Sequence, residues 1–144
     1  MFLGHVSHSI DEKGRLIIPS KYREEIGSQD LVVFPGFSGQ LVVYTKNDFA
    51  VFSSDLKNLK SSNPKEMEIR RFITTNCNMI KPDPQGRILL SQDLRNAAGI
   101  VKEVVITGNL DNFEIWNPER WKEVSNFGDG HQMQEKIEAM GLRI

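Results

Sequence analysis

Apolar and polar residues alternate at the start of the chain and predict two strands joined by a turn. One face of an extended segment over residues 2–10 carries the apolar side chains of Phe2, Val6 and Ile10. Residues 11–14 form the turn, because Asp bonds to nearby backbone and Gly accepts angles that other residues resist. Residues 15–18 are apolar on both faces apart from Arg15, which is typical of a strand inside a barrel or sandwich.

A short helix and a pair of strands follow this unit. Residues 20–26 predict a helix that begins after Pro19 and ends at Gly27, a position where glycine is common. Two apolar runs then predict strands over residues 31–34 and 41–44, joined by a hairpin-like loop. The pattern is therefore strand, turn, strand, helix and strand pair.

The middle and the end of the chain carry helical patterns. A helical face is formed by Phe49, Phe52, Leu56 and Leu59. Good starting residues for helices are Thr45, Asn63 with Pro64, and Asn117 with Pro118. Near the C-terminus a short apolar stripe consists of Met133, Ile137 and Met140. We expect the large aromatic residues Phe49, Phe113, Trp116 and Trp121 to lie in the core.

The whole unit occurs twice. Residues 11–18 return as residues 83–90, a spacing of 72 positions (83 minus 11), and this register continues without a gap to residue 49. In the second copy we expect a helix capped by Ser91 and strands over residues 104–107 and 113–116. Only two copies are present, so a solenoid is not indicated, and the copies are expected to pack against each other.

These patterns divide the chain into four segments. We predict a first module over residues 5–47, a helical linker over 48–76, a second module over 77–119 and a C-terminal helical segment over 120–144. The expected fold class is mainly β with short helices, that is, α+β.

Composition narrows the class of protein. The chain has 144 residues, of which 39% are hydrophobic and 26% charged, as in an ordinary globular domain. No apolar run approaches the roughly 20 residues that span a bilayer, and the first residues do not resemble a signal peptide. Cys77 is the only cysteine, which fits a reducing cytoplasm. The net charge of −1 does not by itself indicate a nucleic-acid binder, so any DNA contact requires a local basic patch.

Arg15 and Arg87 are the sharpest candidates for such a patch. A guanidinium group can grip a phosphate, or two acceptors on guanine, and a rigid turn would position it. In the alternative interpretation each arginine pairs with its own aspartate, Asp11 or Asp83, and locks the turn. Lys13 at the turn tip is a candidate for phosphate contact, with a solvated lysine as the alternative.

The remaining polar residues give weaker signals. Lys21 and Arg23 are secondary DNA candidates, whereas Arg95 is interpreted as a helix-surface cation favoured by the helix dipole. A solvated helix face accounts for Lys65, Arg70 and Arg71. His5 and His8 differ by three positions and so point to opposite faces of a strand, which argues against a metal site. No cofactor motif or catalytic triad is visible, and Cys77 is expected to be a small buried residue.

Residues 1–4, 11–19 and 83–90, with the stretch 102–116, resemble the MraZ family over nearly the whole chain. The resemblance implies two AbrB-like modules in a swapped-hairpin (double-psi-like) barrel. It implies a homo-oligomeric ring that binds short direct repeats in promoter DNA and represses its own promoter and the cell-division and cell-wall gene cluster. Such a protein is cytoplasmic and nucleoid-associated, without a cofactor, metal, membrane or small-molecule substrate. The resemblance assigns DNA contact to Arg15.

Within the same resemblance, each turn is oriented by an aspartate and a glycine, which are Asp11, Gly14, Asp83 and Gly86. Two departures from the family pattern, Pro84 and Ser91, lie in the second copy and leave the role of Arg87 open. One alternative function is an antitoxin-type repressor that holds a protein partner or acts as a scaffold, although the segment after Trp121 is short. Another is an enzyme using Asp11 and Arg15, but no nucleophile or base is recognisable beside them, so we expect no enzyme.

Overall fold

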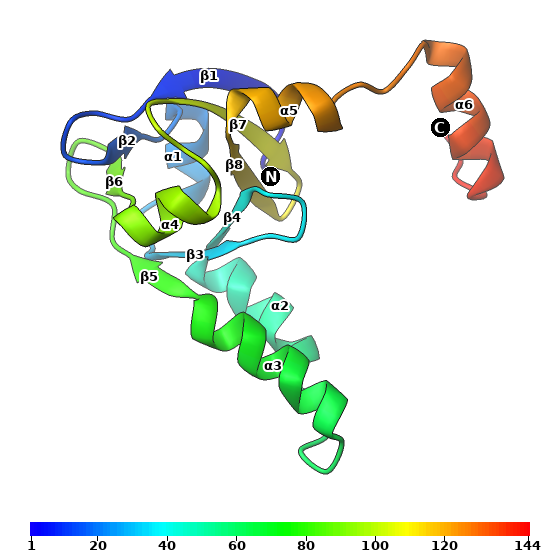
Figure 1. Ribbon diagram of the computed structural model, residues 1–144, viewed down its shortest axis with the longest axis horizontal. Coiled ribbons are helices and arrows are strands. Elements are labelled where there is room, and N and C mark those ends of the chain that lie inside the picture. The colour runs from blue at the N-terminus through cyan, green and yellow to red at the C-terminus, as the bar shows by residue number, and fades with distance from the viewer.

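The computed structural model describes residues 1–144 and shows a β-rich body with short helices around it (Figure 1). The eight strands are β1 His5–Ser9, β2 Arg15–Ile17, β3 Leu31–Pro35, β4 Leu41–Thr45, β5 Asn78–Ile80, β6 Arg87–Leu89, β7 Glu103–Asn109 and β8 Asn112–Trp116. The six helices are α1 Ser20–Ile26, α2 Lys46–Lys57, α3 Pro64–Asn76, α4 Gln92–Ala97, α5 Pro118–Val124 and α6 Gly130–Ala139. The mixed α+β class is confirmed.

The strands form one six-stranded antiparallel sheet and one two-stranded ribbon. The sheet has the order β1-β7-β8-β4-β3-β5, and the ribbon joins β2 to β6. The two copies exchange strands, because β1 of the first copy pairs with β7 of the second, and β5 of the second copy pairs with β3 of the first. These sheets are open at their edges, so the closed swapped-hairpin barrel stays a prediction.

Two strand pairs bring repeat-related residues face to face. In the ribbon, Leu16 lies opposite Ile88, its counterpart 72 positions later (88 minus 16). In the sheet, Val42 lies opposite Glu114, again 72 positions later (114 minus 42). An antiparallel pair is symmetric about such a position, so an approximate twofold axis relates the two copies and passes through both pairs.

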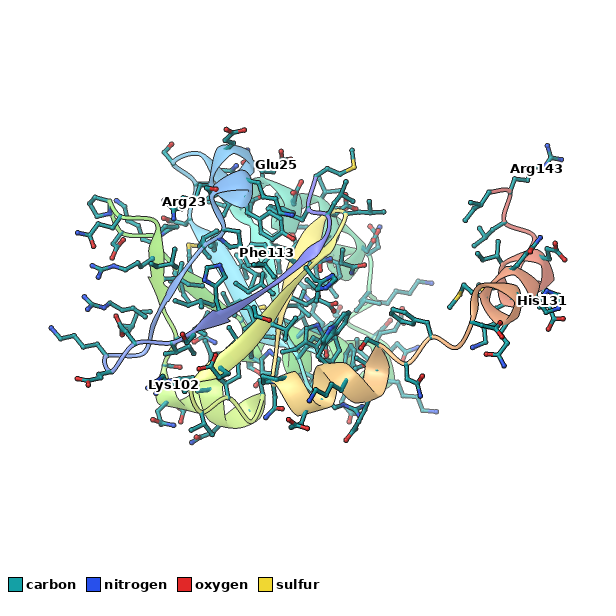
Figure 2. All side chains as sticks on the ribbon, turned by 90° about the horizontal axis from the view of Figure 1, so that it is seen from above. Arg23, Glu25, Lys102, Phe113, His131 and Arg143 are labelled. Carbon is teal, nitrogen blue, oxygen red and sulfur yellow. The ribbon has the colours of Figure 1, made fainter.

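A single core of 19 buried side chains holds the copies together. Leu16 and Ile88 are fully buried in it, so the inner face of the ribbon forms part of the core. Phe2, Tyr22 and Phe113 pack edge to face and tilted, with ring centroids 5.0 to 5.3 Å apart. Figure 2 shows Phe113 in the middle of the body. Apolar burial of this kind contributes about 25 cal/mol per Å² and dominates the stability of the fold.

The starts of the helices follow the capping residues in the sequence. Side-chain oxygens of Thr45, Asn63, Ser91 and Asn117 accept backbone N–H groups in the first turns of α2, α3, α4 and α5. Such caps satisfy donors that have no partner inside the helix. The predicted helix over residues 20–26 is confirmed, and Gly27 caps it with a positive φ of 59°.

Four predictions about these elements were wrong in detail. The first strand begins at His5, and Phe2 makes only an isolated bridge to Leu110. Residues 15–18 are not buried on both faces, because the side chain of Ile17 is 45% exposed. Leu59 lies beyond the end of α2. Phe49 and Trp121 are only half-buried, because they lie on helices that cover the sheet from outside.

The helices α2 and α3 extend from one side of the body, and α6 stands apart from it at the end of a linking segment (Figure 1). Aromatic residues join α2 to the sheet through a stack formed by Phe34, Tyr44, Phe49 and Phe52. Figure 2 places His131 and Arg143 on the outlying C-terminal segment. No helix has the length and apolar character that crossing a membrane would require.

Candidate nucleic-acid interface

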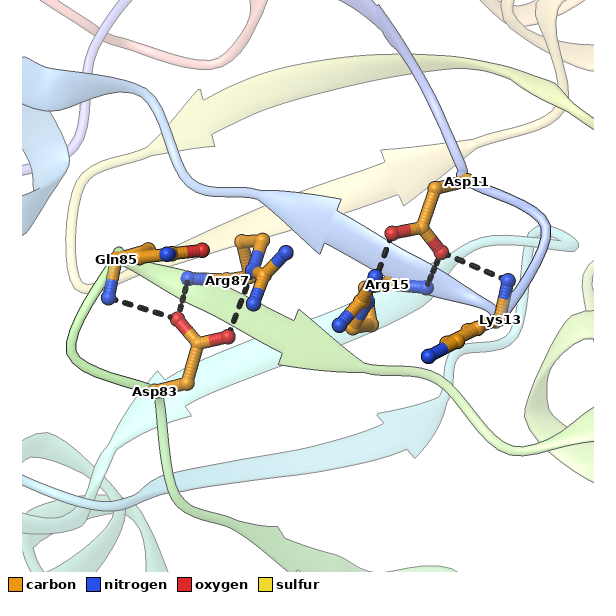
Figure 3. Close-up of polar contacts among 6 residues, drawn as sticks. All are labelled: Asp11, Lys13, Arg15, Asp83, Gln85 and Arg87. Atoms are coloured by element: carbon orange, nitrogen blue, oxygen red, sulfur yellow. Dashed lines mark hydrogen bonds and ion pairs between the residues drawn. The ribbon is translucent and has the colours of Figure 1, made fainter.

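The turn between β1 and β2 is built around the carboxylate of Asp11. One oxygen, Oδ1, accepts the backbone N–H groups of Lys13 and Arg15, each at 2.9 Å. The other, Oδ2, accepts Nε of Arg15 at 2.7 Å (Figure 3). Gly14 has a φ of 82°, which favours glycine, and its N–H donates to the carbonyl of Asp11 at 3.0 Å. Residues 11–15 therefore form a rigid loop, in which the carboxylate of Asp11 fixes the position of the Arg15 side chain.

The turn between β5 and β6 repeats this geometry. Asp83 accepts the backbone N–H groups of Gln85 and Arg87 at 2.9 Å and Nε of Arg87 at 2.7 Å (Figure 3). Gly86 has a φ of 77°. Pro84, which stiffens this turn, does not disturb its hydrogen bonds. The second turn is therefore as well formed as the first.

Both aspartates are held in their charged form. The backbone N–H of Arg15, followed by its side chain, lowers the pKa of Asp11, and burial opposes this only in part. The backbone N–H and side chain of Arg87 lower the pKa of Asp83 in the same way. A carboxylate that accepts several hydrogen bonds is stabilised over the neutral acid. Both ion pairs are therefore formed at neutral pH.

The ribbon brings the two arginines to one face. Leu16 and Ile88 point into the core, so their strand neighbours Arg15 and Arg87 point outward. Their side chains are 31% and 25% exposed, respectively. Only Nε of each guanidinium has a partner in the chain, and the terminal nitrogens make no hydrogen bond or ion pair. The arginines thus lock their turns, as one interpretation of the sequence held, and still present free donors.

Each turn is also anchored by the opposite copy. The backbone N–H of Ile18 donates to the carbonyl of Gly86, and that of Leu90 to the carbonyl of Gly14, both at 2.9 Å. The guanidinium of Arg23 lies against Gly86 and donates from Nε to the carbonyl of Ile18 at 2.9 Å. These bonds keep the tip of one turn next to the strand end of the other.

Arg95 makes the corresponding contact with the first turn. It lies against Gly14 and donates from Nε to the carbonyl of Leu90 at 3.1 Å. The sequence offered one signal for this role, since Arg23 and Arg95 occupy equivalent positions in the repeat. The helix-dipole interpretation of Arg95 missed that its guanidinium crosses to the other copy.

The other candidate cations lie outside the ribbon that carries Arg15 and Arg87. Lys13 stands at the tip of the first turn with an exposed side chain. Lys21 lies on α1, and its Nζ is beside Gly4 and 5.5 Å from the centre of the Tyr22 ring, so this charge lies next to the N-terminal segment and not on the ribbon. Arg71 on α3 is exposed.

The residues considered for metal or thiol chemistry have structural contacts. His5 lies near Trp121, with ring centroids 6.3 Å apart. Cys77 is half-buried, not buried as expected, and its Sγ donates to the carbonyl of Ile73 at 3.1 Å. Burial raises the pKa of this thiol, which disfavours the reactive thiolate.

A hollow of about 430 Å³ lies beside the second turn. It opens between the end of α1 and the segment before β6, and its polar lining includes Arg23, Lys81 and Asp83. No residue of the first turn, residues 11–15, lines this hollow.

The sequence also matches known proteins over nearly its whole length. The profile of the family described as "MraZ protein, putative antitoxin-like" matches twice, over residues 1–72 and 73–142. The chain belongs to the MraZ family. The two matches meet at residue 72, which agrees with the repeat spacing and gives each copy one MraZ unit.

Relatives in several bacteria carry the same MraZ name. The chain is 37% identical over 142 residues to "Transcriptional regulator MraZ" of Lachnoclostridium phytofermentans, covering 99% of both chains. It is 35% identical over 143 residues to the protein of that name in Clostridium tetani and 36% identical to that in Clostridium acetobutylicum. In both cases 99% of this chain and all of the relative are covered.

Proposed function

We propose that the protein is a DNA-binding transcriptional regulator that contacts double-stranded DNA through the outer face of the β2–β6 ribbon. One observation carries this proposal: Arg15 and Arg87 lie on one face, each fixed by an aspartate through Nε and each with free terminal nitrogens. The fixed guanidinium can donate two parallel bonds to phosphate or guanine without first being ordered. The relatives' name, transcriptional regulator, supports the same function.

The residues of the two turns then have distinct roles. Arg15 and Arg87 contact the DNA, and Lys13 adds a phosphate contact at the tip of the first turn. The turns are kept in shape by Asp11, Gly14, Asp83 and Gly86. Arg23 and Lys21 supply further positive charge, although Arg23 is already engaged with Ile18 and Lys21 lies near the N-terminus.

The proposal extends to the assembly and its target. A single chain has a net charge of −1 and offers few free cations, so tight binding needs several chains that act together. We therefore propose that several chains form a homo-oligomeric ring, which binds short direct repeats in promoter DNA. In this proposal it represses its own promoter and the cell-division and cell-wall genes, in the cytoplasm at the nucleoid. A closed swapped-hairpin barrel formed by the two modules, residues 5–47 and 77–119, is the fold that we propose for the body.

The proposed function is binding and not catalysis. Both oxygens of the Asp11 carboxylate already accept hydrogen bonds from the turn, as do those of Asp83. The lowered pKa of each makes these carboxylates weak bases. The carboxylate oxygens that an enzyme would use as a base thus serve here to maintain the shape of each turn.

The test is a binding titration with DNA from upstream of the protein's own gene. We expect the wild-type protein to shift this DNA in preference to unrelated DNA, and Arg15→Ala to weaken binding to it by about 5- to 150-fold. Arg15→Lys keeps the charge but loses the planar fork, so it should rescue little. Arg71→Ala, which removes an exposed cation from α3, is the matched control. Binding by Arg15→Ala that equals wild type would contradict the assignment.

A second function, that of an antitoxin-type repressor, has one structural feature in its favour. The helix α6 stands apart from the body (Figure 1), and its sequence carries an apolar stripe that includes Met133 and Ile137. Under the first proposal, a chain truncated after Ser125 keeps its contact with a single DNA site. An antitoxin would instead require this segment to hold its protein partner, and the truncated chain would lose that partner.

A further inference from the structure

The outer face of the ribbon carries two exposed apolar side chains as well as the two arginines. Opposite residues in the register are Arg15 with Leu89 and Ile17 with Arg87. Ile17 is 45% exposed and Leu89 is 57% exposed, whereas Leu16 between Arg15 and Ile17 is fully buried. The face is therefore a small square in which each arginine has an apolar neighbour along its own strand and another across the ribbon.

The two apolar side chains gain only part of the stabilisation that full burial would give, because about half of each stays exposed. A strand residue gains its energy from the face that it covers, and these two face away from the core. An exposed, apolar two-stranded ribbon also invites association with other strands. Ile17 and Leu89 are counterparts 72 positions apart (89 minus 17 is 72), so the feature occurs in both copies.

A protein surface is a poor occupant for this face. Covering the face would desolvate two guanidinium groups whose terminal nitrogens have no partner in the chain. Burying such charges without new acceptors is costly. The same face of a second copy would place arginine near arginine and supply no carboxylate, because Asp11 and Asp83 are already engaged.

Duplex DNA complements all four side chains. The major groove offers guanine acceptors to arginine and the C5-methyl group of thymine to apolar side chains. Strands in a ribbon lie about 4.8 Å apart, and the groove is about 12 Å wide, so it admits a two-stranded ribbon. The major groove thus presents both kinds of group that the outer face can bind: acceptors for the arginines and methyl groups for the apolar side chains.

We infer that Ile17 and Leu89 determine sequence specificity by contacting thymine methyl groups in the major groove, while Arg15 and Arg87 hold the ribbon there. This inference rests on the proposed DNA-binding function and adds the residues that read the bases and the chemical group that they read. Ile17 and Leu89 differ in shape and lie on different strands, so each contacts a separate thymine.

The experiment removes single methyl groups from the DNA. A binding site is selected from a randomised pool of duplexes, and each thymine in turn is replaced by deoxyuridine, which lacks only the C5-methyl. We expect wild-type affinity to fall about fourfold for each contacted methyl, the effect of losing one buried methyl-sized group. In Ile17→Ser the loss disappears at one thymine, and in Leu89→Ser it disappears at another.

Controls separate this outcome from a general loss of binding. Val51→Ser changes an exposed apolar residue on α2 and should keep the wild-type deoxyuridine profile. Ile17→Thr keeps the β-branched shape and serves as a second variant if the serine variant folds poorly. Circular dichroism and light scattering on each variant test whether fold and assembly are unchanged.

Each outcome decides the inference. Loss of the deoxyuridine effect at separate thymines in the two serine variants supports it. Wild-type binding that is unaffected by deoxyuridine at every position overturns it and leaves the DNA-binding function intact. Failure to select any DNA overturns both proposals. A smaller assembly for Ile17→Ser or Leu89→Ser would show that a second copy covers the face, and would overturn the inference as well.

Discussion

Leu16 lies directly opposite Ile88, the residue that occupies the same place in the second copy of the repeat. Both side chains are fully buried, so this pair ties the two copies at the centre of the ribbon. Every outward feature of the ribbon consequently occurs twice, at equal distances in the register from this pair. The protein thus builds within one chain the kind of symmetric surface that a homodimer presents.

The two arginines should contribute similarly to DNA binding, because their turns have matching hydrogen bonds. The sequence favoured Arg15 over Arg87, since the second turn contains Pro84 and lacks a counterpart of Lys13. We expect Arg15→Ala and Arg87→Ala each to weaken binding by about 5- to 150-fold, the range for one bidentate arginine contact. Fluorescence anisotropy on one DNA box measures both. An Arg87→Ala variant that binds like wild type would restrict the interface to the first turn.

The glycines of the turns should tolerate no side chain. A Cβ on Gly14 would lie 3.0 Å from the carbonyl oxygen of Leu90, in addition to the strain of a φ of 82°. We expect Gly14→Ala to lower the free energy of unfolding by about 1–3 kcal/mol, the usual range for such strain. Urea denaturation measures the loss.

Two further glycines serve as controls for this variant. Gly27→Ala has a positive φ but open space around it, so it should show strain alone. Gly130→Ala has neither strain nor crowding and should leave stability unchanged. Equal stability of Gly14→Ala and Gly130→Ala would contradict the close packing of the turn.

Arg23 and Arg95 should act on stability more than on DNA contact. Each donates from Nε to a carbonyl, of Ile18 or Leu90, at a site where the two copies meet. Removing either donor should cost about 1–3 kcal/mol of unfolding free energy, because the bond comes from a charged group. Arg71→Ala on α3 is the exposed control. If Arg23→Ala unfolds like wild type and only DNA affinity falls, Arg23 is a DNA contact and not an anchor.

The sequence predicted local structure well wherever neighbouring residues determine it. The helix over residues 20–26 and the caps at Asn63 and Ser91 depend on side chains within one turn, and all three are confirmed. The Asp–Gly–Arg pattern of the turns is visible in the sequence, and its recurrence at a fixed spacing is enough to reveal the duplication.

Features that depend on contacts between the copies could not be predicted. The exchange of β1 and β5 is fixed by pairing with strands far away in sequence, which no local pattern encodes. For the same reason Ile17 was expected to be buried, since an apolar strand does not show which of its faces lacks a partner. The packing of Arg95 against Gly14 likewise requires the second copy to be placed first.

The turns should stay intact until the pH falls well below neutral. The pKa of Asp11 is lowered from its ordinary value of 3.8, so the folded state favours the carboxylate. A lowered pKa contributes stability above pH 3.8, and this contribution is lost as the pH falls through the folded-state pKa. Carbon NMR titration should therefore give Asp11 and Asp83 midpoints below 3.8. A midpoint at or above that value would mean that the Asp–Arg pair does not form in solution.

Affinity should depend steeply on salt and on the number of repeated DNA boxes. Each chain presents Lys13, Arg15 and Arg87 near the ribbon, so it neutralises only a few phosphates. Each neutralised phosphate adds about 0.9 to the slope of log affinity against log salt. In an oligomer the ribbon recurs at a fixed spacing, so a site with three boxes should give about three times the slope of a site with one.

Salt titrations on duplexes with one, two and three boxes measure this relation, with light scattering to record the assembly. The variant Lys13→Gln, which matches Gln85 at the equivalent position, should lower the slope by about 0.9 for each engaged chain, because one phosphate contact is lost. This change should therefore grow with the number of boxes, whereas Arg71→Ala on α3 should leave all three slopes unchanged. Slopes that do not change with the number of boxes would mean that one compact site on one chain accounts for all the binding, and the proposed ring would then have no role in DNA recognition.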